Sequence, residues 1–364
     1  MPKYELLRIL HWGPLITLCI IGSISLCTVS CLGQWHNHRD AFLNLARTAT
    51  QLDGRERSEP DRTVWSLVSP YVLTVFLLLS SATLYFYLRA MWGGPGAVPA
   101  NWAPSDLQDT QYLQHCSLCS AYKPPRAHHC RQCGRCIPKM DHHCPWINNC
   151  VGHQNHAHFV LFLLSAVVGC AVATFVLAPS VYWGLYRRWS VLLGLLRGLY
   201  RRWSVSTWPR PSTGASTGDG TCCMAQATRP SCCCPCGALN VLVLCRYLLY
   251  GPGHAPVVLL SLWGLLINMF VLGLAIGVVL AVGLLLYFQV RAVVRNSTAV
   301  EDWILEKANH RRADARLPPF TYPYHLGTWS NLQQVFANVW CTAPGDGIYW
   351  PVREGCTQYT LTIT

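Results

Sequence analysis

Seven cysteines and four histidines fall within 35 residues of this chain, between Cys116 and Cys150. Two cysteine pairs have the Cys-x2-Cys spacing that lets both sulfurs reach one zinc ion, at about 2.3 Å. Eight such ligands suffice for two tetrahedral sites of three cysteines and one histidine. The cluster therefore predicts two zinc sites with side chains left over.

The side chains left over are a carboxyl, an imidazole and a thiol that are close in sequence: Asp141, His142 and Cys144. A carboxylate beside an imidazole orients the ring and favours its cationic form, and an imidazolium stabilises a neighbouring thiolate. The arrangement is typical of a nucleophilic cysteine. A purely structural cluster is the alternative, but two zinc ions do not need the surplus residues.

The composition places this cluster in a membrane protein. The 364 residues are 52% hydrophobic and only 12% charged, which is too apolar for an ordinary soluble domain. Four apolar stretches reach the roughly 20 residues that cross a bilayer as a helix: about Trp12 to Leu32, Val64 to Ala90, Phe159 to Trp183 and Val257 to Val290. The first has no small-residue cleavage site, so we expect an uncleaved anchor. The predicted fold is an all-α polytopic membrane protein.

Zinc thiolates imply a reducing compartment, so the Cys/His region 91–158 is expected in the cytosol. With spans at 12–32, 64–90, 159–183 and 257–290, segments 1–11 and 291–364 are also cytosolic, and loops 33–63 and 184–256 are lumenal. The excess of basic residues in 291–316 supports this topology, whereas the eight arginines of loop 184–256 oppose it.

The net charge of +12 does not indicate a nucleic-acid partner, because the basic residues are dispersed among the spans rather than gathered on one face. The expected partner surface is the lipid bilayer.

Loop 184–256 differs from the rest of the chain. Residues Gly184 to Val191 recur identically as Gly198 to Val205, and the cysteines from Cys222 to Cys236 lack the paired spacing of a metal site. We interpret the segment as an insertion of little or no defined fold. A structured lumenal loop and a gene-model artefact are the alternatives.

The whole run from Cys116 to Gly152 resembles the cysteine-rich domain of the DHHC protein S-acyltransferases. The motif Asp141-His142-His143-Cys144-Pro145-Trp146 and the gapless Cys/His spacing before it carry the resemblance. That family also has four spans, with this domain between the second and third. The resemblance implies palmitoyl transfer from a long-chain acyl-CoA to protein cysteines through an acyl-Cys144 intermediate.

The resemblance also divides the residues between metal and chemistry. It implies one zinc bound by Cys116, Cys119, His129 and Cys136, and a second bound by Cys130, Cys133, His143 and Cys150. Cys144, His142 and Asp141 are then the catalytic residues. Spacing alone does not separate His142 from His143.

Further matches imply contacts with the acyl-CoA. Trp146, Phe159 and Phe162 match positions that line the acyl cavity, and Gly169 falls near its closed end. Three basic residues match positions near the CoA phosphates: Lys123, Arg126 and His128.

Motifs outside this domain resemble the endoplasmic-reticulum subgroup, whose longer members carry a C-terminal Src-homology-3 domain. They include His11-Trp12-Gly13-Pro14 and Gly345-Asp346-Gly347. The expected substrates are membrane-associated proteins with cytosolic cysteines. Because this chain stops at Thr364, partner recruitment through a Src-homology-3 domain is not implied.

Two positions bear on how well this chain fits the family. A Thr-Thr-x-Glu motif appears here with Ala299 in place of the second threonine, which removes a hydroxyl near the active-site aspartate and predicts lower activity. The structural asparagine of the C-terminal motif is present as Asn331. Two other functions remain as alternatives: a zinc-organised membrane scaffold, and a protein that accepts an acyl group without passing it on.

The insertion is expected to be dispensable. Replacing residues 187–253 with a short polar linker should preserve zinc content and acylation of Cys144, because seven excess positive charges on the lumenal side oppose the topology. Zinc analysis and acyl labelling of the deletion variant provide the measurement. A variant that inserts correctly but is not acylated would contradict the prediction.

Overall fold

A computed structural model describes residues 7–53, 64–207, 261–337 and 344–361. It contains four long helices: α2 (Trp12–Asp53), α3 (Val64–Gly93), α4 (His156–Thr207) and α6 (Leu262–Arg295). Each includes a stretch long and apolar enough to cross a membrane: Trp12–Gln34, Pro70–Gly93, His156–Tyr186 and Leu262–Arg295. Inside a bilayer no water is available to the backbone, and an α-helix satisfies its own N–H and C=O groups. Long apolar segments that cross the membrane therefore form helices. The predicted fold class is confirmed.

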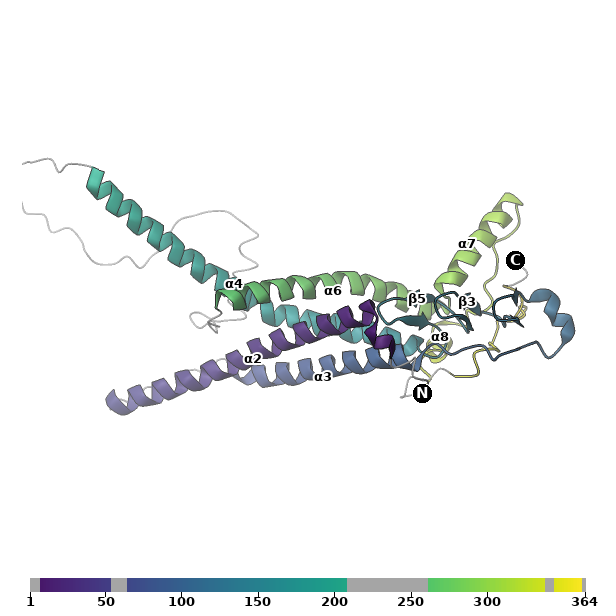
Figure 1. The fold of residues 1–364 in the computed structure, drawn as a ribbon, viewed down its shortest axis with the longest axis horizontal. Helices are drawn as coiled ribbons and strands as arrows, with labels where there is room; N and C mark the ends of the chain where they lie inside the picture. Colours follow the sequence, from purple (N-terminus) through teal and green to yellow (C-terminus); the bar gives the residue numbers. More distant parts are fainter. Residues whose placement is uncertain (1–6, 54–63, 208–260, 338–343, 362–364) are drawn as a thin grey trace, which may run out of the picture. The chain divides into compact units, whose positions relative to one another are not determined.

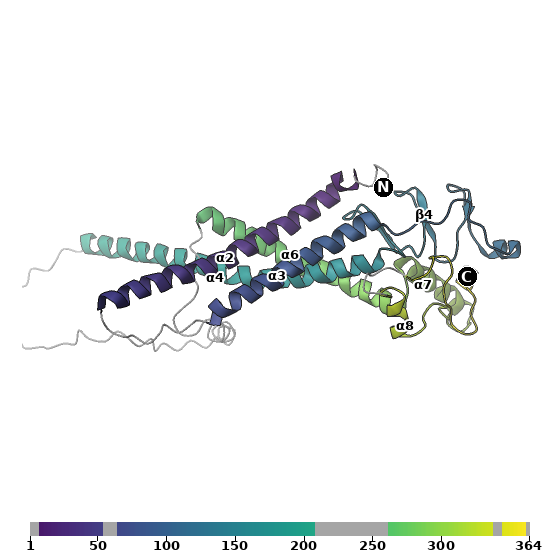
Figure 2. The same ribbon diagram turned by 90° about the horizontal axis from the view of Figure 1, so that it is seen from below.

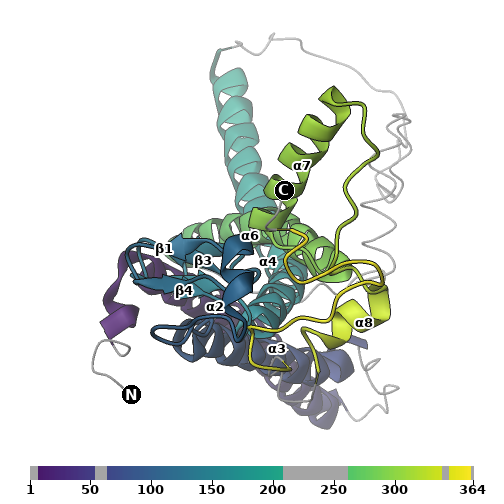
Figure 3. The same ribbon diagram turned by 90° about the vertical axis from the view of Figure 1, so that its right-hand side faces the viewer.

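The described chain divides into two compact units. Unit 1 comprises Met1–Gly33, Val68–Ala178 and Leu266–Thr364, and unit 2 comprises Gln34–Leu67 and Pro179–Leu265. Within unit 1, the β-hairpins, α7 and α8 gather at one end of the four helices (Figures 1 and 2). Figure 3 views unit 1 from that end.

Two long helices extend beyond the predicted spans. Helix α2 continues to Asp53, through most of the expected loop 33–63, and helix α4 continues to Thr207. Both copies of the eight-residue repeat are therefore helical, and the prediction of no defined fold is wrong for residues 184–207. Leucine and arginine are good helix formers and recur through this stretch. Residues 208–260 lie outside the described part of the chain.

The cysteine-rich segment consists of three antiparallel hairpins, which the all-α prediction did not include. They are formed by β1 (His115–Cys116) with β2 (Ala121–Tyr122), β3 (His128–Cys130) with β4 (Arg135–Ile137), and β5 (His142–Cys144) with β6 (Asn149–Val151). Their pairing sets His129 opposite Cys136 and His143 opposite Cys150. Short hairpins are stable here only with added cross-links, which the Cys/His sets are suited to provide.

The C-terminal region folds back onto the end of α6. Helices α7 (Ala299–Asp314) and α8 (Thr328–Gln333) follow it, and Thr298 and Glu301 form a reciprocal capping box at the start of α7. The fully buried Asn331 donates its amide to the Val294 carbonyl at 2.7 Å. The asparagine singled out in the sequence thus ties α8 to the end of the fourth span.

The beginning of α2 packs directly on the loop between β5 and β6. Arg8, in the 3-10 helix η1 (Leu7–Leu10), donates to the Asn148 carbonyl at 2.8 Å, and Asn148 donates back to the Arg8 carbonyl. A Cβ atom added to Gly13 would overlap the Pro145 carbonyl oxygen. Only glycine permits this close approach.

Replacing this glycine should therefore separate α2 from the loop. Gly13→Ala should lower the unfolding temperature in detergent, since overpacking of this kind costs about 1–3 kcal/mol. The matched control is Gly22→Ala in the same helix, where nothing lies within 4 Å of the added Cβ. Tryptophan fluorescence during heating measures the unfolding temperature of each variant. Equal unfolding temperatures for Gly13→Ala and Gly22→Ala would contradict this account.

Candidate functional site

Strand β5 separates the two adjacent histidines onto opposite faces. Side chains alternate along a strand, so His142 and His143 face opposite ways and Cys144 shares the side of His142. The pairing of His143 with Cys150 in β6 directs it to a cysteine cluster. His142 and Cys144 are directed to the other side, where Phe159 near the start of α4 lies against the His142 ring.

Asp141, His142 and Cys144 form a hydrogen-bonded set. The Nδ1 atom of His142 lies 2.7 Å from Oδ2 of Asp141. Burial by itself lowers the pKa of His142, but hydrogen bonds and charge interactions with Asp141 and Cys144 outweigh burial and raise that pKa to about 9. The imidazole is therefore cationic at neutral pH, the state that stabilises a neighbouring thiolate.

The carboxylate of Asp141 is buried and held by donors from three elements. Its Oδ1 accepts the backbone N–H of Ala299 at 2.6 Å, and its Oδ2 accepts from Gln289 at 3.0 Å in addition to His142. Burial raises the pKa of Asp141, yet hydrogen bonds from His142 and Ala299 and the charge of His142 bring it well below its ordinary value. The group is a carboxylate throughout the physiological pH range.

The contact from Ala299 changes the interpretation of the altered Thr-Thr-x-Glu motif. The donor to Asp141 is the main-chain N–H, which alanine and threonine share. The missing hydroxyl therefore does not remove this hydrogen bond. The loss of activity inferred from the sequence has no basis in this contact.

An apolar cavity of about 490 Å³ opens beside Cys144 and runs between the four helices of unit 1. Trp146, Phe159, Phe162 and Gly169 are among the residues that line it. Trp146 is 45% exposed, whereas Phe159 and Phe162 are buried. Ser25 of α2 and Ser80 of α3 also line the cavity and hydrogen-bond to each other at 2.7 Å.

The remaining cysteines and histidines of the hairpins gather into two groups. In each, four ligand atoms lie within 4.8 Å of one another: Cys116, Cys119, His129 and Cys136 in one, and Cys130, Cys133, His143 and Cys150 in the other. Cys119 and Cys136 sulfurs are 3.8 Å apart, and Cys133 and Cys150 sulfurs 3.5 Å. Bonds of about 2.3 Å in a tetrahedron require sulfurs about 3.8 Å apart, so both groups fit a zinc ion.

Arg126 does not occupy the place predicted for it beside a CoA phosphate. Its guanidinium is buried, bonded to both carboxylate oxygens of Glu301 at 2.6 and 2.9 Å, and stacked over Tyr324 and Trp350. Burial raises the pKa of Glu301, but the charge and hydrogen bonds of Arg126 lower it below its ordinary value. The prediction for Arg126 is therefore wrong, because an internal carboxylate already takes its donors.

The other two basic residues are not brought to Cys144 by any contact among the described residues. Lys123 donates to the Gln114 side chain at 3.2 Å near the protein surface. His128 is partly buried in β3, and burial lowers its pKa.

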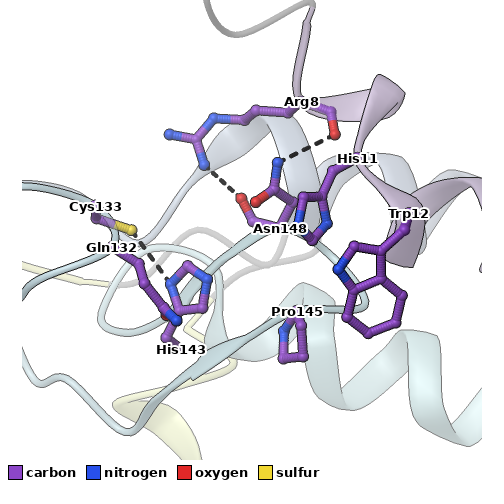
Figure 4. A pocket seen from close by; sticks show the side chains of 8 residues that line it. All are labelled: Arg8, His11, Trp12, Gln132, Cys133, His143, Pro145 and Asn148. Carbon is purple, nitrogen blue, oxygen red and sulfur yellow. Dashed lines mark hydrogen bonds between the residues drawn. The ribbon is translucent and has the colours of Figure 1, made fainter.

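A second, polar pocket of about 400 Å³ lies on the His143 side of β5 (Figure 4). Arg8, His11, Gln132 and Asn148 line it together with His143. Because strand alternation puts His142 and Cys144 on the other face, this pocket is separate from the apolar cavity.

Gln289 and His156 are the site residues that sequence reasoning missed. Both are buried, and His156 lies 3.0 Å from the Gln289 carbonyl oxygen. The available signal was an amide side chain in an otherwise apolar span, since polar residues inside the membrane usually have a function.

Known proteins resemble this chain in sequence. Residues 109–207 match the DHHC palmitoyltransferase family. Palmitoyltransferase ZDHHC6 of Mus musculus is 38% identical over 365 residues, covering 99% of this chain and 70% of the relative, and that of Homo sapiens has the same values. Palmitoyltransferase PFA4 of Mycosarcoma maydis is 30% identical over 320 residues, covering 78% and 53%.

The family resemblance seen in the sequence is thus confirmed along nearly the whole chain, and it agrees with the four spans and the hairpins between the second and third. This chain belongs to the DHHC palmitoyltransferase family of protein S-acyltransferases.

Proposed function

We propose that this protein transfers palmitoyl from palmitoyl-CoA to cysteines of membrane-associated proteins through an acyl-Cys144 intermediate. The observation that carries the proposal is the position of Cys144, which lies beside the Asp141–His142 pair and lines the apolar cavity. One thiol thus meets both an activating imidazole and a space suited to an acyl chain.

The first half-reaction forms the acyl-enzyme. The Cys144 thiolate attacks the thioester carbonyl carbon, the new carbon–sulfur bond forms, and the bond to the CoA sulfur breaks. His142 gives its proton to the departing CoA thiolate and becomes neutral. Asp141 keeps the ring oriented throughout.

The second half-reaction reverses the proton movement. Neutral His142 takes the proton of the incoming substrate thiol, and the resulting thiolate attacks the acyl group on Cys144. Cys144 leaves as a thiolate beside imidazolium, which is the starting state. Both steps exchange one thioester for another, so positioning and exclusion of water matter more than driving force.

The acyl chain is proposed to lie in the apolar cavity, against Phe159 and Phe162, with Trp146 at the entrance. Burial of each methylene group contributes about 0.8 kcal/mol. Lys123 and His128 are proposed to lie near the CoA phosphates. Arg126 is not included, because it pairs with Glu301.

Two zinc ions are proposed to hold the hairpins. The first site uses Cys116, Cys119, His129 and Cys136, and the second uses Cys130, Cys133, His143 and Cys150. Bound zinc would supply structural cross-links only, because four protein ligands leave no position for substrate. The second site would keep β5, and thus Cys144, against the ends of the spans.

We further propose that the protein resides in the endoplasmic-reticulum membrane with both termini in the cytosol. Its four apolar helices make it a multi-pass membrane protein, and its subgroup motifs support this compartment. Two spans separate the cysteine-rich domain from each terminus, so both termini lie on the same side of the membrane as that domain.

Acylation of Cys144 is the direct test. Palmitoyl-CoA should label the wild-type protein through a hydroxylamine-sensitive bond, and Cys144→Ser should abolish the label while keeping zinc, because serine is a much weaker nucleophile. Transfer from labelled enzyme to a cysteine peptide would distinguish a transferase from an acyl acceptor. Persistent label in Cys144→Ser would refute the assignment.

The adjacent histidines should give opposite results. His143→Ala should lose about one zinc per chain, because it removes one of four ligands. His142→Ala should retain both metals and lose acylation. Elemental analysis and acyl labelling of the two variants measure this, and equal zinc loss would mean that their roles are wrongly divided.

The Ala299 N–H should matter more than the Ala299 side chain. Ala299→Pro removes the donor to Asp141 at the first position of α7, where proline is tolerated in helices. Thr298 already has the extended backbone that precedes proline. Acylation should slow about ten- to a hundredfold, since a hydrogen bond to a buried charge contributes about 1.5–3 kcal/mol.

Ala299→Thr is the matched control and should retain the wild-type rate. A slow threonine variant together with a normal proline variant would show that the side chain, and not the backbone, supports Asp141.

A further inference from the structure

We infer that Gln289 of α6 and His156 of α4 are positioning residues for acyl transfer. They act on the site through Asp141, so the inference rests on the proposed function. Neither residue is expected to touch the acyl group or CoA.

The two side chains form a buried relay that ends on the carboxylate. His156 is 2% exposed and Gln289 5%. Nε2 of His156 lies 3.0 Å from Oε1 of Gln289, and Nε2 of Gln289 lies 3.0 Å from Oδ2 of Asp141. The same Oδ2 atom accepts from His142 at 2.7 Å.

The chemistry of the carboxylate fixes the direction of this relay. An ionised carboxylate only accepts hydrogen bonds, so the amide of Gln289 must present its NH₂ group to Asp141. Its carbonyl oxygen then faces His156, and Nε2 of His156 must carry a hydrogen. Every atom along the relay therefore has a single donor or acceptor role.

The relay acts on His142 through the Oδ2 atom of Asp141, which both side chains share. Because Oδ2 also accepts a hydrogen bond from Nδ1 of His142, the other ring nitrogen is left for Cys144. Rotation of the Asp141 carboxylate would turn the imidazole away from the thiol. Gln289 and the Ala299 N–H hold the two oxygens separately, and together they prevent that rotation.

The relay also joins the two helices that contribute much of the acyl cavity. His156 begins α4, which carries Phe159 and Phe162, and Gln289 lies near the end of α6, which lines the cavity from Gly273 to Leu285. Hydrogen bonds in such a buried place are strong and costly to leave unpaired. A purely structural role would be to hold these helices together, so the test must separate the two roles.

A double-mutant cycle in the full-length protein makes this separation. The rate of Cys144 acylation by palmitoyl-CoA is measured in single turnovers for wild type, Gln289→Met, Asp141→Asn and the double variant. Methionine matches glutamine in length and has no N–H. Gln289→Met should lower the maximal rate about tenfold without changing the half-saturating palmitoyl-CoA concentration; tenfold corresponds to about 1.4 kcal/mol.

In the Asp141→Asn background, Gln289→Met should cause no further loss, because the group through which it acts has already been changed. His156→Phe should slow the wild type less than Gln289→Met and should add nothing to Gln289→Met. The matched control is His158→Phe, which removes another buried histidine of α4, whose Nε2 has no hydrogen-bond partner among the described residues. This control should keep the wild-type rate.

The inference would be overturned if the rate losses of Gln289→Met and Asp141→Asn multiplied in the double variant. It would also be overturned if Gln289→Met changed the half-saturating palmitoyl-CoA concentration or kept the wild-type rate. If Gln289→Met loses zinc or fails to fold, the cycle of His156→Phe with Asp141→Asn decides the question in the same way. Failure of the wild-type protein to acylate Cys144 would instead refute the proposed function, which separates the two failures.

Discussion

The buried ion pair between Arg126 and Glu301 is the interaction on which the arrangement of the site depends. Arg126 comes from the cysteine-rich segment and Glu301 from the first turn of α7, and both side chains are almost fully enclosed. Loss of one partner of such a pair costs about 3–5 kcal/mol, because the other charge stays buried. Glu301 also completes the capping box of α7, so the pair fixes where that helix begins and hence where the Ala299 N–H meets Asp141.

The rest of the site is assembled from small elements that could not hold it alone. Three hairpins of two or three residues per strand carry the two Cys/His groups suited to zinc and Cys144. Arg8 and Gly13 bring α2 against the loop after Cys144, and Tyr87 of α3 donates to the Trp146 carbonyl at 3.0 Å. Helices α2 and α3 thus contact the loop that follows Cys144, α4 places Phe159 against the His142 ring, and α6 donates to Asp141. Because they also surround the apolar cavity, the thiol is positioned by the same helices that would enclose an acyl chain.

Much of this could be predicted because the relevant signals are local in sequence. Apolar runs longer than about 20 residues identify the spans, and the Cys-x2-Cys spacing identifies the metal-binding groups. The cavity-lining places of Phe159 and Phe162 followed from family resemblance. Arg126 was misplaced because a sequence shows a basic residue but not the carboxylate that pairs with it 175 positions later. The repeat at 184–205 is helical because its leucine and arginine residues favour a helix, which the identity of the two copies does not by itself indicate.

The sequence by itself determined the apolar spans and the Cys/His cluster, since both depend on residue type and short-range spacing, and resemblance to the family divided that cluster into two candidate zinc sites and a candidate nucleophile, Cys144. Tertiary structure alone decided what surrounds Asp141. Its three donors come from β5, α6 and the backbone of α7, and hydrogen bonds of this kind depend on distances of about 3 Å between segments far apart in the chain. A backbone N–H leaves no mark in the residue types, and a lone glutamine in an apolar helix acquires its role only when packing brings it to a carboxylate.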